Sequence, residues 1–546
     1  MKKIAPILMG VFICILVMGG SYIWAMRLMD SVYEYKSPLH NSAPIRGDSI
    51  GSPITRSLVI VLIDGLNYGT SMDASTMPFL NQLRSQGATA KMHSLPPSYS
   101  QAAYTVLLTG AWSELNDGPI INWDFTDIPT LTQDNIFSDA HWVGMQTAIS
   151  GFNWFEKLVP QGAVSAKFYT AGEDQVADRE VVDAALPWLK EGKYQLMLIH
   201  LDQVDYAGHH EGGPIDPRWN AAAKRVDDLL KEITTSMNLT QETLLVVSDH
   251  GHIDYGGHGG QDAIVLQEPF VLVGKGVMPG NYGDVQMVDV APTVATILGT
   301  NIPATNQGHP QVAMLDITLD QISNINALIA LQQNELVQAY QTAVGSPVTI
   351  RPSSDVVTAS QAGIIATQDN ILNTQMLPRG LIAIIVVLLL INLAAWHSRP
   401  YFGAMILGIA GYLLVFNVKY VLIDHKTYSL SSVVDATNLI ASSALTTLLA
   451  LLVGWILVMI GTKIYQFKPR KAADVTMKFI LVMLAVLSIP IFLHYAMNGA
   501  IVTWALPNFL ISFLGLIFLI QTLVVAAIGI LFTGLAALLG ALARQR

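Results

Sequence analysis

Six long apolar stretches constrain the fold of this 546-residue chain more than any other feature. An α-helix needs about 20 mostly apolar residues to cross the hydrocarbon core of a bilayer. Each stretch has close to that number or more, so we expect an α-helical membrane protein. The stretches are 4–25, 379–397, 401–423, 436–462, 478–496 and about 505–541.

The first and last stretches each allow two interpretations. The first follows Lys2 and Lys3 and is either a cleaved signal peptide or an anchor. Because no Ala-x-Ala site precedes Met26, we expect an uncleaved anchor. The last stretch is longer than one bilayer needs, so it is either one span with an interfacial helix or a tight hairpin. The first option gives six spans and the second gives seven.

Basic residues indicate the orientation, because cytoplasmic loops of membrane proteins are rich in Lys and Arg. With Lys2 and Lys3 inside, residues 27–376 lie outside. The most basic loop, at 463–478, then falls inside. Arg544 and Arg546 also fall inside if the last stretch crosses once, which favours six spans.

The region expected outside is acidic. From Ser398 onward there are ten Lys or Arg and three Asp or Glu, of 30 and 40 in the whole chain, so the first 397 residues hold 20 basic and 37 acidic groups. This charge argues against nucleic acid as a partner. The one cysteine, Cys14, lies in the first span, so the outer region has no disulfide. That absence favours a bacterial plasma-membrane protein.

The outer region predicts an α/β domain, because apolar strand-like runs alternate with helical stretches. Such alternation is typical of a mostly parallel sheet between helical layers. The runs lie at 57–63, 143–149, 194–199, 243–248 and 269–274, and the helical stretches include 79–86, 177–191 and 219–236. The expected parts are an anchor at 1–26, a linker at 27–54, a catalytic domain at 55–310, a helical connector at 311–376 and a transmembrane domain of about five spans at 377–546.

Carboxylates and imidazoles follow three of the expected strands. In open α/β sheets ligands bind beyond the carboxyl ends of the strands, and mixed carboxylate and imidazole ligands suit zinc. A polar turn with locally hydrogen-bonded histidines is the alternative for the last group, at 249–258. The residues are Asp64, Asp205, His209, Asp249, His250 and His258.

Ser100, whose side chain is a hydroxyl, begins a further segment that is expected to be helical. A hydroxyl at a helix N-terminus is usually a cap. The same position suits a nucleophile that attacks an anion, because the start of a helix favours negative charge.

These motifs resemble the alkaline phosphatase superfamily, in particular the branch of type I phosphodiesterase/nucleotide pyrophosphatases and GPI ethanolamine phosphate transferases. The resemblance covers roughly residues 55–310 and implies a three-layer, alkaline-phosphatase-like α/β domain beside the α-helical transmembrane domain. It rests on Asp-Gly at 64–65, a Pro-Thr-x-Thr…Thr-Gly-like segment at 97–110, Asp-x-x-Gly-His at 205–209, Ser-Asp-His-Gly at 248–251, Gly-x-His-Gly around His258 and an Asp-Leu-x-Pro-Thr-like segment at 289–293.

The resemblance implies two divalent metal ions, most often zinc. Two ions about 4 Å apart can clamp the attacking and leaving oxygens of an in-line phosphoryl displacement. Coordination would also make Ser100 a nucleophile that forms a phosphoserine. The implied ligands are Asp205, His209 and His258 for one ion, and Asp64, Asp249, His250 and Ser100 for the other.

Asn122 is a further candidate, because the segment 118–123 resembles an asparagine segment of the nucleotide pyrophosphatases. The implied role is an amide donor to a phosphate oxygen, and a turn asparagine is the alternative. Four nearby residues match no motif position, and we expect them to hydrogen-bond to ligands or to solvent. They are His200, Asp202, His210 and His252.

The leading functional hypothesis is a membrane-anchored, extracytoplasmic phosphodiesterase or pyrophosphatase acting on a nucleotide-, lipid- or glycan-linked phosphate ester. The absence of a basic residue directly after Ser100, where the transferases have one, favours a monoanionic diester or a diphosphate over a dianionic monoester. The alternative is a phosphoethanolamine or related phospho-alcohol transferase acting on a lipid or glycan, which the multi-span tail favours. A domain that only binds is a third option, but all seven metal-ligand positions hold competent residues.

Overall fold

The computed structural model describes residues 5–349, 353–463 and 468–542. These residues form two compact units, one spanning Tyr35–Ile371 and the other joining the residues up to Glu34 to those from Leu372 onward. The basic residues at 2, 3, 544 and 546, on which the expected orientation partly depends, lie outside the described residues.

The Tyr35–Ile371 unit is built on one eight-stranded sheet in the order β4-β3-β5-β1-β6-β7-β2-β8. Among the described strands β7 alone runs antiparallel, to both β6 and β2, so the sheet is mostly parallel as expected. The strands are β1 (Leu58–Ile63), β2 (Ala88–His93), β3 (Thr147–Phe152), β4 (Ala166–Thr170), β5 (Leu196–Leu201), β6 (Thr243–Val247), β7 (Gln267–Gly274) and β8 (Gly280–Gln286).

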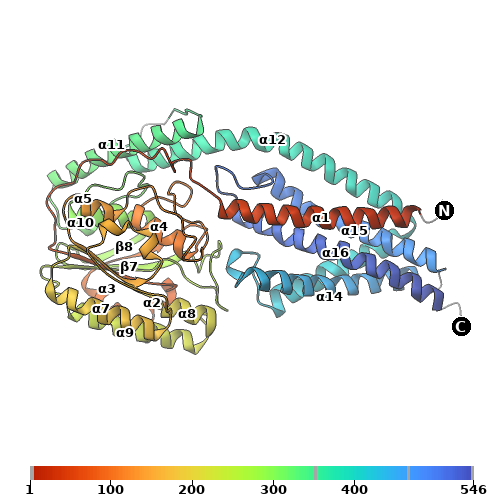
Figure 1. The fold of residues 1–546 in the computed structure, drawn as a ribbon, viewed down its shortest axis with the longest axis horizontal. Helices are drawn as coiled ribbons and strands as arrows, with labels where there is room; N and C mark the ends of the chain where they lie inside the picture. The colour runs from red at the N-terminus through yellow and green to blue at the C-terminus, as the bar shows by residue number, and fades with distance from the viewer. Residues whose placement is uncertain (1–4, 350–352, 464–467, 543–546) are drawn as a thin grey trace. The chain divides into compact units, whose positions relative to one another are not determined.

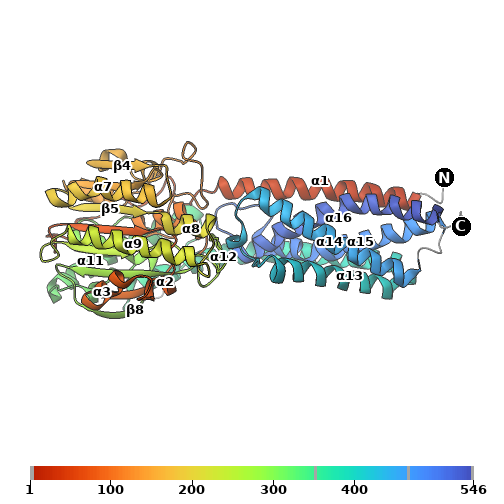
Figure 2. The ribbon, with the colours of Figure 1, turned by 90° about the horizontal axis from the view of Figure 1, so that it is seen from below.

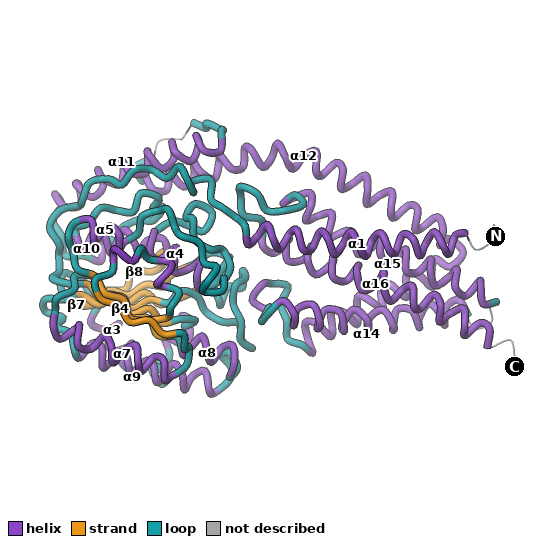
Figure 3. The backbone as a smooth tube through the Cα atoms, viewed as in Figure 1, coloured by secondary structure: helices purple, strands orange, loops and turns teal. Residues whose placement is uncertain are grey.

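Helices cover both faces of this sheet, which gives three layers (Figures 1 and 3). Successive side chains of a strand point to opposite faces, so a strand covered on both sides must be apolar throughout. Thus Ile60 of β1 packs in one core with α4, α5 and α10, while Val61 packs in a second core with α3, α7 and α9. The helices of this unit are α2 (Tyr68–Met72), α3 (Pro78–Gln86), α4 (Ser100–Thr109), α5 (Ile136–Trp142), α6 (Phe155–Leu158), α7 (Gln175–Glu191), α8 (Gln203–His210), α9 (Pro217–Thr235), α10 (Val290–Leu298) and α11 (Leu319–Val344).

Five described segments are helical, long and apolar enough to cross a membrane: Ala5–Tyr33, Val356–Ile423, Ala436–Thr462, Pro469–Asn498 and Phe509–Leu539. The second contains two of the expected spans, because a short turn at Arg399–Tyr401 separates α12 from α13. The chain is therefore a multi-pass membrane protein. The helices are α1 (Ala5–Tyr33), α12 (Val356–Ser398), α13 (Phe402–Asn417), α14 (Ala436–Thr462), α15 (Pro469–Asn498) and α16 (Phe509–Leu542).

The last apolar stretch is one uninterrupted helix, α16. The tight hairpin considered for this stretch does not form, because no turn interrupts the helix from Phe509 to Leu542. Helix α16 packs against α1, α14 and α15, and these helices lie side by side in Figure 2. Helix α1 continues to Tyr33, so the first residues of the expected linker are helical.

Candidate metal centre

Three neighbouring strands bring the candidate ligands together. Strands β5, β1 and β6 are adjacent and parallel, so their carboxyl ends lie at one edge of the sheet. Asp64 follows β1, helix α8 follows β5 and carries Asp205, and Asp249 follows β6. This edge is where open parallel sheets bind ligands.

Asp64, Asp249 and His250 form the first group of side chains, all of them buried. The Nε2 atom of His250 lies 3.2 Å from Asp249 Oδ2 and 3.5 Å from Asp64 Oδ1. The backbone N–H of Gly65 donates to Asp249 Oδ1 at 3.1 Å, which joins the loops that follow β1 and β6. One oxygen of each carboxylate and one imidazole nitrogen are thereby directed at a common point.

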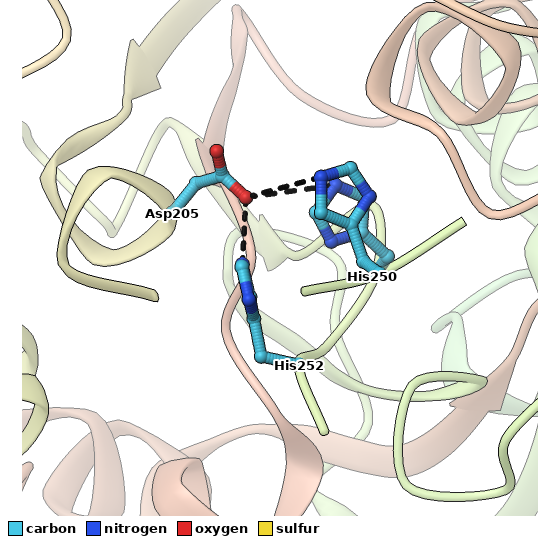
Figure 4. A group of neighbouring side chains, drawn as sticks. Asp205, His250 and His252 are labelled. Atoms are coloured by element: carbon cyan, nitrogen blue, oxygen red, sulfur yellow. Dashed lines mark hydrogen bonds and ion pairs between the residues drawn. The ribbon is translucent and has the colours of Figure 1, made fainter. Parts of the chain in front are cut away.

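Asp205, His209 and His258, expected to share the second ion, lie near one another, but the group of potential ligand atoms around Asp205 is His250, His252 and His258. Asp205 Oδ2 lies 3.5 Å from His209 Nε2, and Asp205 Oδ1 lies 3.6 Å from His258 Nε2. The two Nε2 atoms of His209 and His258 are 3.0 Å apart. Asp205 and His209 share one face of α8 because they are four residues apart. Figure 4 shows one Asp205 carboxylate oxygen facing both His250 and His252.

Backbone hydrogen bonds set the tautomers of His250 and His258. Nδ1–H of His250 donates to the carbonyl of Gly251 at 3.2 Å, and Nδ1–H of His258 donates to the carbonyl of Ser98 at 2.9 Å. Burial lowers the pKa of His250, and it lowers the pKa of His258 well below its usual value. Both rings are therefore neutral at pH 7 and present an Nε2 lone pair to the carboxylates, as metal-binding imidazoles do.

The buried carboxylates have oxygen atoms that no protein group satisfies. Asp64 Oδ1 and Asp249 Oδ2 have no hydrogen-bond partner among the described residues. Burial, and then the nearby charge of Asp64, raises the pKa of Asp249 well above its usual value. Unpaired buried carboxylates are costly, whereas a divalent cation would accept both oxygens. The residues therefore fit metal ions.

Ser100 is the first residue of α4, and it lies at this centre. Its Oγ is 3.2 Å from His250 Nε2, and its side chain is buried. Because Nδ1 of His250 carries the hydrogen, the Ser100 hydroxyl donates this bond. The hydroxyl thus combines two features expected of a nucleophile for anionic substrates, a helix N-terminus and contact with a candidate metal ligand.

Asn122 lies beside the nucleophile. Its Oδ1 accepts the backbone N–H of Gln101 at 3.1 Å. The side chain of Gln101 holds the next residue, Trp123, through two bonds to its backbone at 2.8 and 3.1 Å. With Oδ1 engaged, the Nδ2 group of Asn122 is the end of the amide left to meet a phosphate oxygen. Gln101 was not singled out from the sequence, and its position directly after Ser100 was the available signal.

The four residues not assigned to a metal occupy different environments. His252 Nε2 lies 2.7 Å from Asp205 Oδ1, and His200 Nε2 lies 2.9 Å from Asp64 Oδ2, so both hydrogen-bond to candidate ligands. Asp202 is buried near Asp64, and burial followed by the charge of Asp64 raises its pKa well above the usual value. His210 is exposed.

Tyr104 is a residue of the site that the sequence did not indicate. Its hydroxyl donates to Asp64 Oδ2 and lies 2.8 Å from His200 Nε2. Tyr104 is four residues after Ser100, so one turn of α4 separates the hydroxyl that holds Asp64 from the candidate nucleophile. That spacing was the only sequence signal for its role.

Two glycines of the motifs leave room for the ring of His252. A Cβ on Gly208 would stand 2.3 Å from His252 Cε1, and a Cβ on Gly65 would stand 2.9 Å from Asp205 Cα and 3.0 Å from His252 Nε2. The glycines of the Asp-Gly and Asp-x-x-Gly-His motifs are therefore required by this close packing.

The last motif, at 289–293, contributes no candidate metal ligand. Asp289 accepts backbone N–H groups of Gln286 and His309 at 2.9 and 2.8 Å, and the side-chain amide of Gln311 at 3.0 Å. These bonds tie the start of α10 to the segment that follows it. The carboxylate is satisfied by this structural role.

Known proteins resemble the unit that carries this site. Residues 58–118 and 119–315, just under half of the chain, match the family model described as type I phosphodiesterase / nucleotide pyrophosphatase. The human GPI ethanolamine phosphate transferase 2, catalytic subunit, is 28% identical over 277 residues, which are 47% of this chain and 28% of that protein. The mouse GPI ethanolamine phosphate transferase 3, catalytic subunit, is 24% identical over 351 residues, 57% of this chain and 31% of that protein.

This chain thus spans less than a third of the length of each of these two relatives. Among solved structures, the human ectonucleotide pyrophosphatase/phosphodiesterase 5 aligns with 45% of this chain and 95% of its own, with 13% identity and a TM-score of 0.38. The murine protein of the same name aligns with 45% and 96%, with 13% identity and a TM-score of 0.37.

Proposed function

Residues 58–315 belong to the type I phosphodiesterase / nucleotide pyrophosphatase family of the alkaline phosphatase superfamily, and from this premise we propose that the chain is a phosphoethanolamine, or related phospho-alcohol, transferase. The observation that carries the proposal is the Ser100 hydroxyl at a helix start, 3.2 Å from a histidine of a buried carboxylate–imidazole centre. A hydroxyl nucleophile beside such a centre is suited to phosphoryl transfer through a covalent intermediate.

We prefer the transferase to the phosphodiesterase or pyrophosphatase that the sequence alone favoured. The two relatives described above are named as ethanolamine phosphate transferases. A hydrolase needs only water as acceptor, whereas a lipid-linked donor or acceptor must be reached from the membrane. The several apolar helices of this chain fit an enzyme whose substrates lie in the bilayer.

Two divalent cations, zinc being the metal that suits these ligands, would lower the pKa of the Ser100 hydroxyl and neutralise charge on the phosphoryl oxygens. Asp205, His209 and His258 would hold one ion. Asp64, Asp249 and His250, with the Ser100 hydroxyl, would hold the other.

The proposed reaction has two displacements. Ser100 Oγ loses its proton and attacks phosphorus, the bond from phosphorus to the donor alcohol breaks, and that alcohol leaves with a proton. An acceptor alcohol then attacks the phosphoserine, and the Ser100 hydroxyl is regenerated. The Nδ2 group of Asn122 donates to a phosphoryl oxygen during both steps and so stabilises the charge that develops there.

The substrate is a phosphate ester linked to a lipid or glycan, and no nucleic acid takes part. We propose that the catalytic unit lies on the extracytoplasmic side, because Arg470 and Lys471 at the start of α15 would then lie in the cytoplasm, as the positive-inside rule favours. We assign the protein to a plasma membrane, in a bacterium as the lack of outer cysteines favours.

The proposal is tested with the purified full chain in vesicles that contain phosphatidylethanolamine labelled in its headgroup. We expect transfer of label to an added lipid-linked alcohol in excess of its release to water. Ser100→Ala should abolish both while leaving the metal content largely intact, because Asp64, Asp249 and His250 remain as ligands of that ion. Ser85→Ala, at an exposed position of α3, is the control and should behave like the wild type.

Two outcomes contradict this proposal. Release of label at the same rate with and without an acceptor alcohol would support the hydrolase instead. Full transfer by Ser100→Ala would exclude Ser100 as the nucleophile.

A further inference from the structure

The membrane helices line a half-open cavity of about 580 Å³. It lies among α1, α12, α15 and α16, all within the unit that contains residues up to Glu34 and from Leu372 onward. Pockets that hold small ligands have volumes of roughly 300–1,000 Å³. The cavity is therefore large enough to hold a ligand.

The wall of the cavity is apolar over most of its length. Leu390 and Leu393 of α12, Leu481 and Ala485 of α15 and Leu519 of α16 are among the lining residues. Protein interiors are close-packed, and apolar cavities exclude water. In a bilayer the apolar molecule present at high concentration is the acyl chain of a lipid, so an acyl chain is the occupant that suits this wall.

Polar groups lie at one end of the cavity. Lys478 Nζ is 2.7 Å from Asp474 Oδ2, and both side chains line the cavity with His397. His397 Nδ1–H donates to the carbonyl of Leu393 at 2.9 Å. This end lies beside the first turns of α1, because Pro6 and Met9 line the cavity too.

The charge at this end is positive. Arg399 follows His397 by two residues, and Arg470 and Lys471 precede Asp474 by about one helical turn. All three are exposed. Together with Lys478 they outnumber the one carboxylate, that of Asp474. Basic pockets between transmembrane helices bind the phosphate of anionic lipid headgroups.

The opposite end of the cavity carries polar groups that are already paired. Trp24 Nε1–H donates to the carbonyl of Ala500 at 2.7 Å, and the hydroxyls of Ser21 and Thr522 are 2.9 Å apart. Lys478 is the one Lys or Arg among the described lining residues, so a lipid phosphate inside the cavity finds complementary charge at the Lys478 end.

We propose that this cavity is a binding site for one anionic glycerophospholipid, with an acyl chain along the apolar wall and the phosphate at Lys478. The site is separate from the candidate metal centre, and it does not depend on the reaction proposed for that centre. A lipid held there fills the space between α12 and the helices α1, α15 and α16.

Two glycines of α1 provide a matched pair of variants. A Cβ on either Gly19 or Gly20 would meet no heavy atom within 4 Å. Gly20 lines the cavity and Gly19 is not among its lining residues. Gly20→Phe therefore fills the cavity, and Gly19→Phe places the same ring elsewhere on the same helix. Ala485→Phe on α15 is a second filling variant for the case in which Gly20→Phe does not fold.

The experiment is native mass spectrometry of the full chain, stripped of lipid in detergent and titrated with phosphatidylglycerol, phosphatidylethanolamine or phosphatidylcholine of identical acyl chains. We expect one phosphatidylglycerol to bind, and the cavity-filling variants to lose it while Gly19→Phe keeps it. Lys478→Gln should weaken phosphatidylglycerol binding about fivefold, the usual contribution of one cation near a lipid phosphate. Lys463→Gln, an exposed residue outside the lining, should leave it unchanged.

Equal affinity for the three lipids, or a preference for either zwitterionic lipid, would overturn the assignment of an anionic headgroup. Unchanged lipid binding in a folded cavity-filling variant would overturn the site itself.

Discussion

His252 donates its Nε2–H to Asp205 Oδ1 across 2.7 Å, while its Nδ1 accepts the backbone N–H of Gly257 at 2.8 Å. Both ring nitrogens are thus engaged, and burial lowers the pKa of the ring to about 4. His252 is a neutral donor at pH 7. It fixes one oxygen of Asp205 and leaves the other toward His209, so His252 is a positioning residue for this carboxylate.

Replacing His252 with Ala should weaken metal binding at the Asp205 group. Loss of a hydrogen-bond partner of a metal ligand typically reduces affinity about 10–100-fold. Competition with a calibrated chelator measures the change, and His210→Ala, at an exposed position, is the control. Unchanged affinity in His252→Ala would refute this positioning role.

Gly208→Ala should disturb the same ring. The new Cβ would stand 2.3 Å from His252 Cε1, so the ring or α8 must shift, and overpacking of this kind costs about 1–3 kcal/mol. We expect a lower melting temperature together with lower activity. Gly69→Ala in α2, where a Cβ meets nothing within 4 Å, should leave both unchanged. A fully active Gly208→Ala would show that the ring adapts.

Asn122→Ala should reduce kcat with little change in KM, because the amide is expected to act on charge that develops during the reaction. Removal of one such donor costs about 10²–10³ in kcat. Gln101→Ala should give a smaller loss of the same kind, since it frees the backbone of Trp123 beside Asn122. A change in KM alone would instead assign Asn122 to substrate binding.

Chelation should destabilise the catalytic unit. Asp64 and Asp249 are 2% and 0% exposed, and one oxygen of each carboxyl group has no hydrogen-bond partner among the described residues. Metal that binds only the folded state adds to stability, so the apparent melting temperature should fall in EDTA and recover with added zinc. Ser100→Ala, which keeps the carboxylates, should show the same shift. An unchanged melting temperature would count against a cation at this group.

Asp178 gives the stability a pH dependence of its own. Burial raises the pKa of this carboxyl to about 6, although it accepts N–H groups from Asp202 and Gln203. The folded state therefore keeps a proton that the unfolded state has released between about pH 4 and pH 6. Stability from this group is present below the unfolded pKa and is lost as pH rises through the folded pKa.

The loss amounts to about 3 kcal/mol between these limits. Thermal melts of wild type and Asp178→Asn from pH 4 to pH 7 measure it, and the variant should lack this component. An identical pH profile for the two proteins would contradict the assignment.

The parts of the fold that sequence predicted are those buried on both faces. Strands β1, β5 and β6 are buried throughout, and apart from Thr243 and His200 their residues are apolar, as expected for covered parallel strands. Strands β2, β4 and β8 were missed because each is only partly buried, and β8 is almost wholly exposed. An exposed edge strand needs no apolar pattern, so its pairing is decided by its neighbours.

The candidate site shows the same division. Residues in a short motif, such as Asp249 with His250, were evident from their spacing. Tyr104 and Gln101 act through groups that are distant in sequence, for example Tyr104 on Asp64 forty residues away. A hydrogen bond between separate strands and helices has no periodic pattern, so only the folded chain shows it.

The rings of His250 and His258 are stacked, with centroids 3.7 Å apart and planes 8° from parallel. Each ring is also tied at Nδ1 to a backbone carbonyl, so neither can turn without moving the other. An ion that settles against one imidazole therefore orders the ligand of its neighbour. Loading of the two positions should be cooperative, and at limiting metal the population should divide into chains with two ions and chains with none.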